Sequence, residues 1–261
     1  MNPIVILDSG AGGLTVFDEI NRMMPWLPVV YCADNAGFPY GPKPEDEVTE
    51  RVCHYLSLLN ERYSPALVVI ACNTASTVAL TAARERLDIP VVGVVPAIKT
   101  AATLSQNRCI GLLATPGTVN RNYTDNLIHE FASDCSVIKV GSTDLVHIAE
   151  SSFCGEAIST QKLETILHPF LEADVQPDHI VLGCTHFPLV REELSTVMPD
   201  VTWVDSGEAI ARRVFSLLGN HINEETATPK HIAHLTGDGE QAQLFTSAIA
   251  GRGFHALSVL P

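Results

Sequence analysis

Two cysteines stand in similar surroundings and are the residues best suited to chemistry. Cys72 ends an apolar run and opens a polar turn with Asn73 and Thr74, and Cys184 ends another and is followed by Thr185 and His186. An apolar, β-branched run that leads into a polar turn predicts a strand followed by a helix, with the thiol at the strand's carboxyl end. Helix N-termini point N–H groups outward there, which favours a thiolate able to act as a base or a nucleophile.

The spacing of the seven cysteines narrows that chemistry. No C-x-x-C pair occurs, so neither a zinc cluster nor a thioredoxin-type dithiol is indicated. Cys184 and His186 could form the nucleophilic pair of an amidase or glutaminase, which would leave the Cys72 turn without a role. Two thiols on opposite sides of one carbon could instead remove a proton from one face and return one to the other, which is the acid–base chemistry of a racemase or epimerase.

The other five cysteines are interpreted as small hydrophobic residues. Cys32, Cys53 and Cys109 belong to apolar segments and are predicted to be buried, and the same interpretation is open for Cys135 and Cys154.

The elements that must position these groups follow an α/β pattern with mainly parallel sheets. Apolar β-branched runs, predicted as strands, alternate with amphipathic segments, predicted as helices. The strands are expected at residues 4–7, 29–33, 66–71, 91–95, 109–114, 136–140, 179–183 and 202–205. Helices are expected over segments such as 45–59, 75–87, 120–132, 161–171 and 208–218. Residues 220–230 and the tail carry no chemical signal.

The alternation contains an approximate internal repeat. One predicted strand leads into Asp8-Ser9-Gly10, and a later apolar strand ends at Cys72. Another leads into Thr115-Pro116-Gly117, and a later apolar strand ends at Cys184. We therefore predict two pseudosymmetric α/β domains, residues 1–95 with 206–261 and residues 96–205. The turn at Asp205, which resembles the one at Asp8, is interpreted as the architectural return of the chain to the first domain.

Composition excludes several classes of protein. Of 261 residues, 46% are hydrophobic, which is enough apolar surface to exclude intrinsic disorder. The formal net charge of −14 disfavours nucleic acid or an anionic membrane as partner. The apolar runs are too short to span a bilayer and no secretory signal is apparent, so a cytoplasmic location with free thiols is expected.

An ordered set of motifs resembles bacterial glutamate racemases over residues 3–218. It comprises Asp8-Ser9-Gly10 with Gly12-Gly13-Leu14, Ala33-Asp34 with Pro39-Tyr40-Gly41, Ala71-Cys72-Asn73-Thr74-Ala75-Ser76, Gly93-Val94-Val95-Pro96-Ala97, Ala114-Thr115-Pro116-Gly117-Thr118, Gly183-Cys184-Thr185-His186-Phe187-Pro188 and Val204-Asp205-Ser206-Gly207. The resemblance implies a cofactor-independent isomerase that interconverts L- and D-glutamate for peptidoglycan synthesis. It also implies two α/β domains with the active site in the interdomain cleft, and members that often form homodimers.

The same resemblance implies roles for individual residues. Cys72 and Cys184 match the two catalytic bases, and Asp8 and His186 match their polar assistants. The residues that match substrate-binding positions are Asp8, Ser9, Tyr40, Gly41, Asn73, Thr74, Thr115, Thr118, Thr185 and His186. Glu150 matches a further carboxylate, although Gly141-Ser142-Thr143-Asp144 before it departs from the family's Cys-Pro pair. Several of these residues also suit helix N-caps, so capping is the competing interpretation.

No cofactor or metal is expected to take part. None of the lysines, Lys43, Lys99, Lys139, Lys162 and Lys230, lies in a motif, so nothing indicates pyridoxal phosphate. The charge that develops at the α-carbon must then be stabilised by oriented N–H and O–H dipoles. The proposed site residues include no Arg or Lys, so the substrate's carboxylates should be held by neutral donors.

Three alternatives stay open at this point. The first is a racemase of aspartate or another carboxylated substrate in the same superfamily. The second is the Cys184–His186 amidase, and the third is an amino-acid-binding module in which the cysteines take no part.

Overall fold

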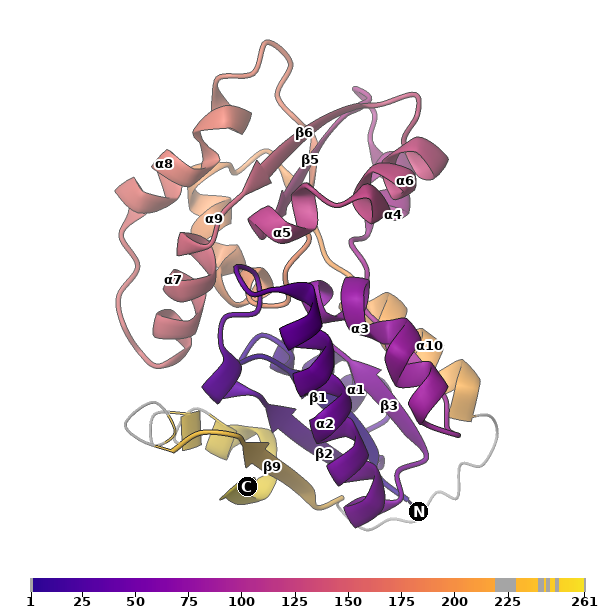
Figure 1. Ribbon diagram of the computed structural model, residues 1–261. Helices are drawn as coiled ribbons and strands as arrows, with labels where there is room; N and C mark the ends of the chain where they lie inside the picture. The colour runs from indigo at the N-terminus through magenta and orange to yellow at the C-terminus, as the bar shows by residue number, and fades with distance from the viewer. Residues whose placement is uncertain (1, 219–228, 239–241, 243–244, 247–248, 261) are drawn as a thin grey trace. The chain divides into compact units, whose positions relative to one another are not determined.

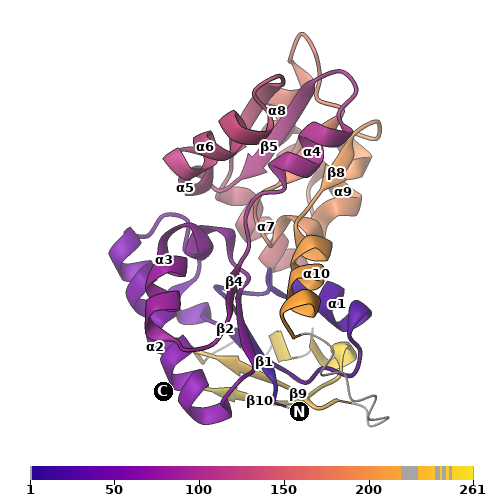
Figure 2. The same cartoon turned by 90° about the vertical axis from the view of Figure 1, so that its right-hand side faces the viewer.

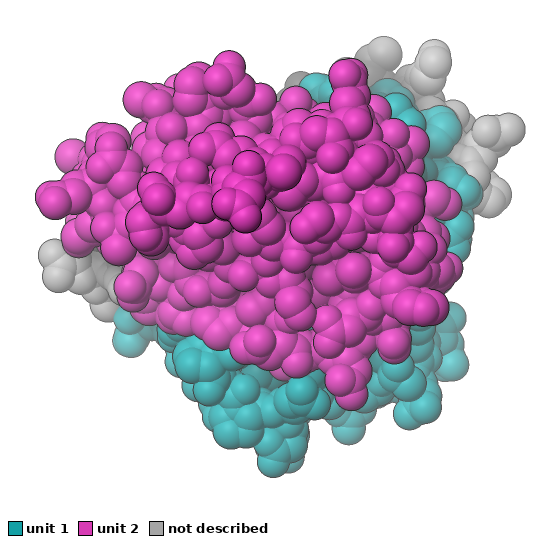
Figure 3. Space-filling view, turned by 90° about the horizontal axis from the view of Figure 1, so that it is seen from above, with its two compact units in different colours: residues 1–94, 207–261 teal, residues 95–206 magenta. Residues whose placement is uncertain are grey.

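The computed structural model describes residues 2–218, 229–238, 242, 245–246 and 249–260, and the chain divides into two compact units. Unit 1 comprises residues 1–94 and 207–261, and unit 2 comprises residues 95–206 (Figure 3, teal and magenta). Most of the segment 220–230, which carries no chemical signal in the sequence, lies outside the described residues. Within the described part, no helix combines the length and the apolar character needed to cross a bilayer.

Unit 1 is built on a parallel sheet in which the strands are ordered β10-β9-β2-β1-β3-β4. Its strands are β1 (Ile4–Asp8), β2 (Val29–Ala33), β3 (Leu67–Ile70), β4 (Val91–Gly93), β9 (His231–Leu235) and β10 (Phe254–Val259). The first three are buried along their whole length, as expected for parallel strands covered on both faces.

Helices cover both faces of this sheet. On one face α2 (Glu45–Tyr63) packs beside α3 (Asn73–Arg86), and on the other α1 (Leu14–Met23) packs beside α10 (Gly207–Leu218) (Figure 2). Alternate strand residues such as Val5, Leu7 and Val68 meet the buried side of α2 and α3 in one apolar cluster. A short 3-10 turn, η1 (Asn35–Gly37), follows β2, and η3 (Ala250–Arg252) precedes β10.

Unit 2 is built on a parallel sheet ordered β6-β5-β7-β8. Its strands are β5 (Cys109–Ala114), β6 (Ser136–Gly141), β7 (His179–Leu182) and β8 (Thr202–Val204). Its helices are α4 (Ile98–Leu104), α5 (Pro116–Val119), α6 (Asn122–Phe131), α7 (Asp144–Phe153), α8 (Thr160–Leu171), η2 (Phe187–Val190) and α9 (Arg191–Val197). The pair α4 and α6 lies on one side of β5 and the pair α8 and α9 on the other (Figure 1).

The two sheets share one strand order, which confirms the pseudosymmetry predicted from the sequence. β2-β1-β3-β4 in unit 1 corresponds to β6-β5-β7-β8 in unit 2. In each, the chain first adds a strand on one side of its starting strand and then crosses to the other side. Ligands of open parallel sheets bind at such a switch point, outside the carboxyl ends of the strands. At the first switch point Asp8 ends β1 and Cys72 follows β3, and at the second Thr115 follows β5 and Cys184 follows β7.

All eight predicted strands are present, whereas β9 and β10 were missed. Their sequences mix histidine and serine with apolar residues, and most of β10 is exposed, so neither shows the continuous apolar run of the other strands. The missed strands extend the unit 1 sheet beyond β2. At the turn after β8, Asp205 pairs with Arg191, the Ser206 hydroxyl donates to Val95 O at 2.5 Å, and the chain enters unit 1 at Gly207.

A buried histidine fastens the returning chain. Tyr63 Oη lies 2.6 Å from His234 Nε2, and Ser258 Oγ lies 2.9 Å from His234 Nδ1, which joins α2, β9 and β10. Burial, with a smaller contribution from the positive charge of Arg62, lowers the pKa of His234 to about 4.

This shift predicts a pH-dependent stability. The unfolded chain protonates His234 near its ordinary pKa of about 6.5, and the folded chain does so only near 4, so between these values the unfolded state binds more protons. The free energy of unfolding should therefore fall as the pH is lowered from 6.5 to 4, by about 1–3 kcal/mol from this group. Urea unfolding of the wild type and of His234→Gln should show a shallower pH dependence in the variant. His54→Gln, on the exposed side of α2, is the control, and equal slopes for all three proteins would contradict the assignment.

Candidate active site

Asp8 and Ser9 form a buried turn at the end of β1. Asp8 Oδ1 accepts a hydrogen bond from Gly10 N at 2.9 Å, and Tyr31 Oη donates to Gly10 O at 2.6 Å. The turn also needs a glycine at position 13, because a Cβ there would lie 2.6 Å from Asp8 Cβ. The sequence predicted the carboxylate, while the tyrosine that fixes its turn was not predicted.

Cys72 occupies the N-cap position of α3, directly after β3. Its side chain is almost buried, at 7% exposure. Ala71 N donates to Leu7 O at 2.8 Å, so the strand end that carries Cys72 is bonded to the strand end that carries Asp8. One turn into α3, Ser76 Oγ donates to Ile70 O and accepts from Val94 N, both at 2.9 Å, which fixes the start of the helix against β3 and the residue after β4.

The carboxamide of Asn73 contains a buried acceptor that the protein leaves unused. Asn73 is 4% exposed, and its Oδ1 has no hydrogen-bond partner among the described residues. An unpaired buried acceptor costs about 1–3 kcal/mol, so it calls for an explanation. Beside Cys72, at the first position of α3, the oxygen is suited to accept a hydrogen bond from a bound ligand. Thr74 next to it is equally buried.

The side chain of Tyr40 is buried and bonded within unit 1. Its ring is 1% exposed, and its hydroxyl donates to Asp34 Oδ2 at 2.5 Å. Burial first, and then the neighbouring Asp34 carboxylate, raises the pKa of Tyr40 well above its usual value. The hydroxyl is therefore committed to Asp34, and the backbone of Tyr40 and Gly41 is what this turn can offer to a ligand.

In unit 2, two threonines form a hydroxyl pair at the end of β5. Thr115 is the N-cap of α5, and its Oγ1 accepts from Thr118 N at 3.3 Å and lies 3.0 Å from Thr118 Oγ1. Both side chains are buried, and Thr124 Oγ1 fixes the turn by donating to Thr118 O at 2.5 Å. The Thr115 side chain therefore caps α5, a role that the sequence did not predict for it, and the two hydroxyls give this turn neutral polar groups.

Cys184, His186 and Glu150 form a chain of side-chain contacts. Cys184 Sγ lies 3.9 Å from His186 Nδ1, and His186 Nε2 lies 2.8 Å from Glu150 Oε2. His186 is 1% exposed, and Cys184 and Thr185 are also buried. Burial opposes protonation of the imidazole, but the hydrogen bonds that the ring makes with Cys184 and Glu150 outweigh it and raise the pKa of His186 well above its usual value. The structure therefore brings Glu150, whose sequence context was atypical, into contact with a predicted site residue.

The remaining thiols show no such arrangement. All seven cysteines are free, and Cys32, Cys53 and Cys109 are buried as predicted, while Cys135 and Cys154 are partly exposed. Burial raises the pKa of Cys32, Cys109, Cys135 and Cys154, which keeps these thiols protonated.

A network around Asp34 was not predicted. The Asp34 carboxylate is fully buried and accepts hydrogen bonds from Arg51 Nε at 2.6 Å and Arg51 Nη2 at 2.7 Å. It also accepts hydrogen bonds from the hydroxyls of Tyr40 and Thr236. Asp34 belongs to a recognised motif, but nothing in the spacing of Arg51 or Thr236 indicates that the two residues meet at one carboxylate.

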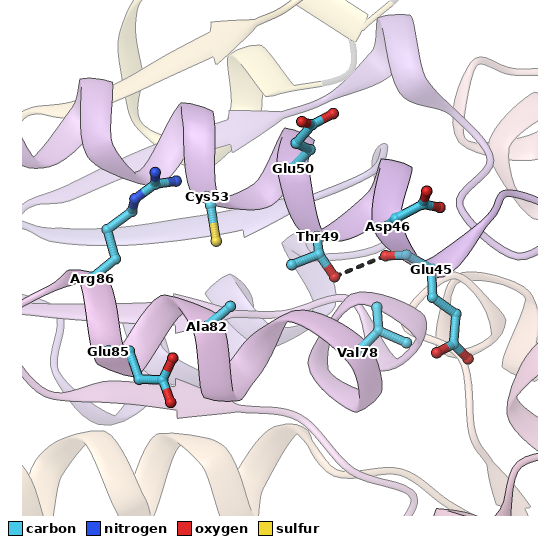
Figure 4. A pocket seen from close by; sticks show the side chains of 9 residues that line it. All are labelled: Glu45, Asp46, Thr49, Glu50, Cys53, Val78, Ala82, Glu85 and Arg86. Atoms are coloured by element: carbon cyan, nitrogen blue, oxygen red, sulfur yellow. Dashed lines mark hydrogen bonds between the residues drawn. The ribbon is translucent and has the colours of Figure 1, made fainter.

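The groove between α2 and α3 contains none of the predicted site residues. It is lined by Glu45, Asp46, Thr49, Glu50, Cys53, Val78, Ala82, Glu85 and Arg86 (Figure 4). Across the described part of the chain, no group of three or more His, Cys, Asp or Glu side chains is arranged to hold a metal ion.

Comparisons with known proteins identify the family of the chain. The profile of the Asp/Glu/Hydantoin racemase family matches residues 4–214. The glutamate racemase of Serratia proteamaculans is 47% identical over 99% of this chain and 90% of its own length. The structure of Escherichia coli glutamate racemase in complex with L-glutamate and the activator UDP-MurNAc-ala aligns with a TM-score of 0.94 at 46% identity, covering 100% of this chain and 98% of that one.

A more distant structure extends the likeness. Glutamate racemase from Francisella tularensis in complex with D-glutamate aligns with a TM-score of 0.82 at 25% identity, covering 100% of this chain and 97% of that one. The matches span both units and every motif that carries a candidate residue. The chain belongs to the Asp/Glu/Hydantoin racemase family and, within it, to the glutamate racemases.

Proposed function

We propose that the chain interconverts L- and D-glutamate without a cofactor, using Cys72 and Cys184 as the two acid–base groups, and so supplies D-glutamate for peptidoglycan synthesis. The observation that carries the proposal is the repeated placement of a thiol next to a polar strand end at the switch point of each sheet. The related enzymes whose structures hold L-glutamate or D-glutamate support the choice of substrate. Residues 1–95 with 206–261 and residues 96–205 are proposed as its two domains.

In the proposed reaction one thiolate removes the α-proton while the other thiol donates a proton to the opposite face. The scheme requires both sulfur atoms to reach one α-carbon from opposite sides. Because the roles exchange with the direction of reaction, each thiol needs a neighbour that supports both of its protonation states.

The two thiols have different neighbours. Cys184 faces His186, whose imidazolium is stabilised by Glu150 and can in turn stabilise a thiolate. Cys72 lies at the positive end of the α3 dipole, beside a strand end that presents the Asp8 carboxylate. By the family pattern, Cys72 acts on D-glutamate and Cys184 on L-glutamate.

Neutral groups are proposed to hold the substrate. The unused Asn73 Oδ1 suits the α-ammonium group, because an ammonium is a donor with no acceptor. The hydroxyl pair of Thr115 and Thr118 suits a carboxylate, and the backbone amides at the starts of α3 and α5 add oriented dipoles. Such donors, fixed before the reaction, can also stabilise charge that develops on the substrate carboxylate during proton removal.

The contact between Cys184, His186 and Glu150 also suits a nucleophilic cysteine, so an amidase is the second candidate. It predicts ammonia release through a thioester and gives Cys72 no role. A homodimer, a cytoplasmic location and the preference for glutamate over aspartate are further predictions from the resemblance.

Replacing either thiol tests the two-base scheme. Cys72→Ala and Cys184→Ala should each lower the racemisation rate by roughly 10²–10⁴-fold or more, since each removes a proton-transfer group. Circular dichroism of L- and of D-glutamate measures the rate, with Cys135→Ser as the control outside the site. In D₂O the product enantiomer should carry deuterium at Cα while the remaining substrate initially does not. Near-normal turnover by Cys72→Ala would sink the scheme, and ammonia release by that variant would favour the amidase.

Replacing Asn73 should separate stability from activity. Asn73→Ala removes a buried, unpaired acceptor, so the free energy of unfolding should stay level or rise by up to about 1 kcal/mol, while KM for glutamate rises several-fold. Chemical denaturation and steady-state kinetics measure the two effects. An asparagine that only caps the helix would give the opposite result, a loss of stability with an unchanged KM.

The link from Glu150 to His186 predicts a shift in the pH profile. Glu150→Gln removes a negative charge that raises the pKa of His186, so the imidazolium should lose its proton at a lower pH. The alkaline limb of kcat/KM should therefore move toward acid by roughly 1–3 pH units. Glu164→Gln, on the exposed side of α8, should leave the profile in place. An alkaline limb that does not move in Glu150→Gln would remove Glu150 from the mechanism.

A further inference from the structure

The turn that carries Tyr40 and Gly41 is tied to the C-terminal part of the chain. After β2, Asn35 Oδ1 accepts from Thr236 N at 2.9 Å and from Gly237 N at 2.8 Å. Asn35 Nδ2 also donates to Gly237 O at 3.1 Å. One asparagine side chain thus makes three hydrogen bonds to the backbone that follows β9.

The Thr236 hydroxyl adds a second connection. It donates to Asp34 Oδ1 at 2.5 Å and accepts from Ala36 N at 3.1 Å, so both its donor and its acceptor capacity are used within the turn. Asp34 in turn receives the Tyr40 hydroxyl through Oδ2, and its backbone N–H donates to Asp8 O at 2.8 Å. Asp34 therefore connects Thr236 by hydrogen bonds to both the Tyr40 hydroxyl and the backbone of Asp8.

These bonds do more than hold β9 in the sheet. β9 is already held by its parallel register with β2, in which Val30 faces Ile232 and Ala33 faces Leu235, and by the contacts of His234 with Tyr63 and Ser258. The Thr236 hydroxyl lies beyond the last paired residue, and its hydrogen bonds to Asp34 and Ala36 both reach the turn after β2, while Tyr55 of α2 interacts with it from the other side. Its contacts therefore hold residues 34–36, and the backbone of Tyr40 and Gly41 follows a few residues later in the same turn.

We propose that Thr236 is a positioning residue for substrate binding, which acts through Asp34 and Ala36 on the Tyr40–Gly41 turn. For the identity of the substrate the inference rests on the proposed function. The C-terminal return of the chain then belongs to the binding machinery, although it contains none of the predicted site residues.

Removing the hydroxyl has a definite physical consequence. In Thr236→Val, which keeps the side chain's shape, Asp34 Oδ1 loses one of its two donors and Ala36 N loses its acceptor. The turn can recover these bonds only by moving or by admitting water. Because the turn holds substrate without transferring protons, looser positioning should weaken ground-state and transition-state binding equally and so raise KM.

Kinetics of matched variants test the proposal. Thr236→Val should raise KM for both enantiomers of glutamate roughly fivefold to thirtyfold, while kcat stays within about threefold. Thr236→Ser, which keeps the hydroxyl, should restore KM. The control is Thr49→Val on α2, where the lost hydroxyl bonds only to Glu45 O of the same helix (Figure 4). A Thr236→Val enzyme with KM within about twofold of wild type, or a loss confined to kcat, would overturn the inference.

A second readout does not depend on turnover. Hydrogen–deuterium exchange of peptides covering residues 34–43 should be faster in Thr236→Val than in the wild type, and unchanged in Thr49→Val. Should Thr236→Val fail to fold, Asn35→Ala takes its place, because it releases the same backbone segment and should show the same rise in KM. Unchanged exchange in residues 34–43 would overturn the link between Thr236 and the Tyr40–Gly41 turn, whatever the substrate of the wild type is. A wild type that leaves glutamate unchanged would overturn the proposed function alone.

Discussion

The order of strands in the two sheets is the constraint on which the candidate site depends. In each unit the chain places its second strand on one side of the first and its third on the other, so the first and third strands end side by side at the point where the chain changes direction. Helices begin just beyond these ends, and their unpaired N–H groups face the same space. Asp8 and Cys72 in one unit, and Thr115 and Cys184 in the other, owe their positions to this geometry. No special local conformation is needed to bring a thiol next to a polar partner.

The surroundings of the two thiols differ although their backbones correspond. Around Cys184, a buried histidine lies next to the thiol, and a glutamate contacts the other nitrogen of that histidine. Around Cys72, the support comes from the helix start and from a carboxylate turn held by Tyr31 and Gly13. Pseudosymmetry of the fold therefore does not extend to the side chains that surround the two thiols.

Much of this arrangement was predictable from the sequence because its signals are local. A β-branched run that stops at Cys72-Asn73-Thr74 defines a strand, a turn and a helix start within a few residues, and the same holds at Cys184. Contacts between distant segments carry no local signal. The bonds from Arg51 and Thr236 to Asp34, and from His234 to Tyr63, depend on how the chain returns, and β9 itself is too polar to resemble the other strands. Tyr40 shows the same limit, because the sequence predicted its position but not that its hydroxyl is used by Asp34.

The added strands also decide which part of the unit 1 sheet is open to other chains. Without β9 and β10, the flank of β2 would be a buried, apolar strand with a free row of N–H and C=O groups, which is a template for aggregation. With them, the sheet ends on that side at β10, where four of six residues are exposed, among them a histidine and a serine. The C-terminal strands thus place the unpaired edge of the sheet two strands farther from β1, which carries Asp8, and this outer edge includes polar side chains that the buried strand β2 lacks.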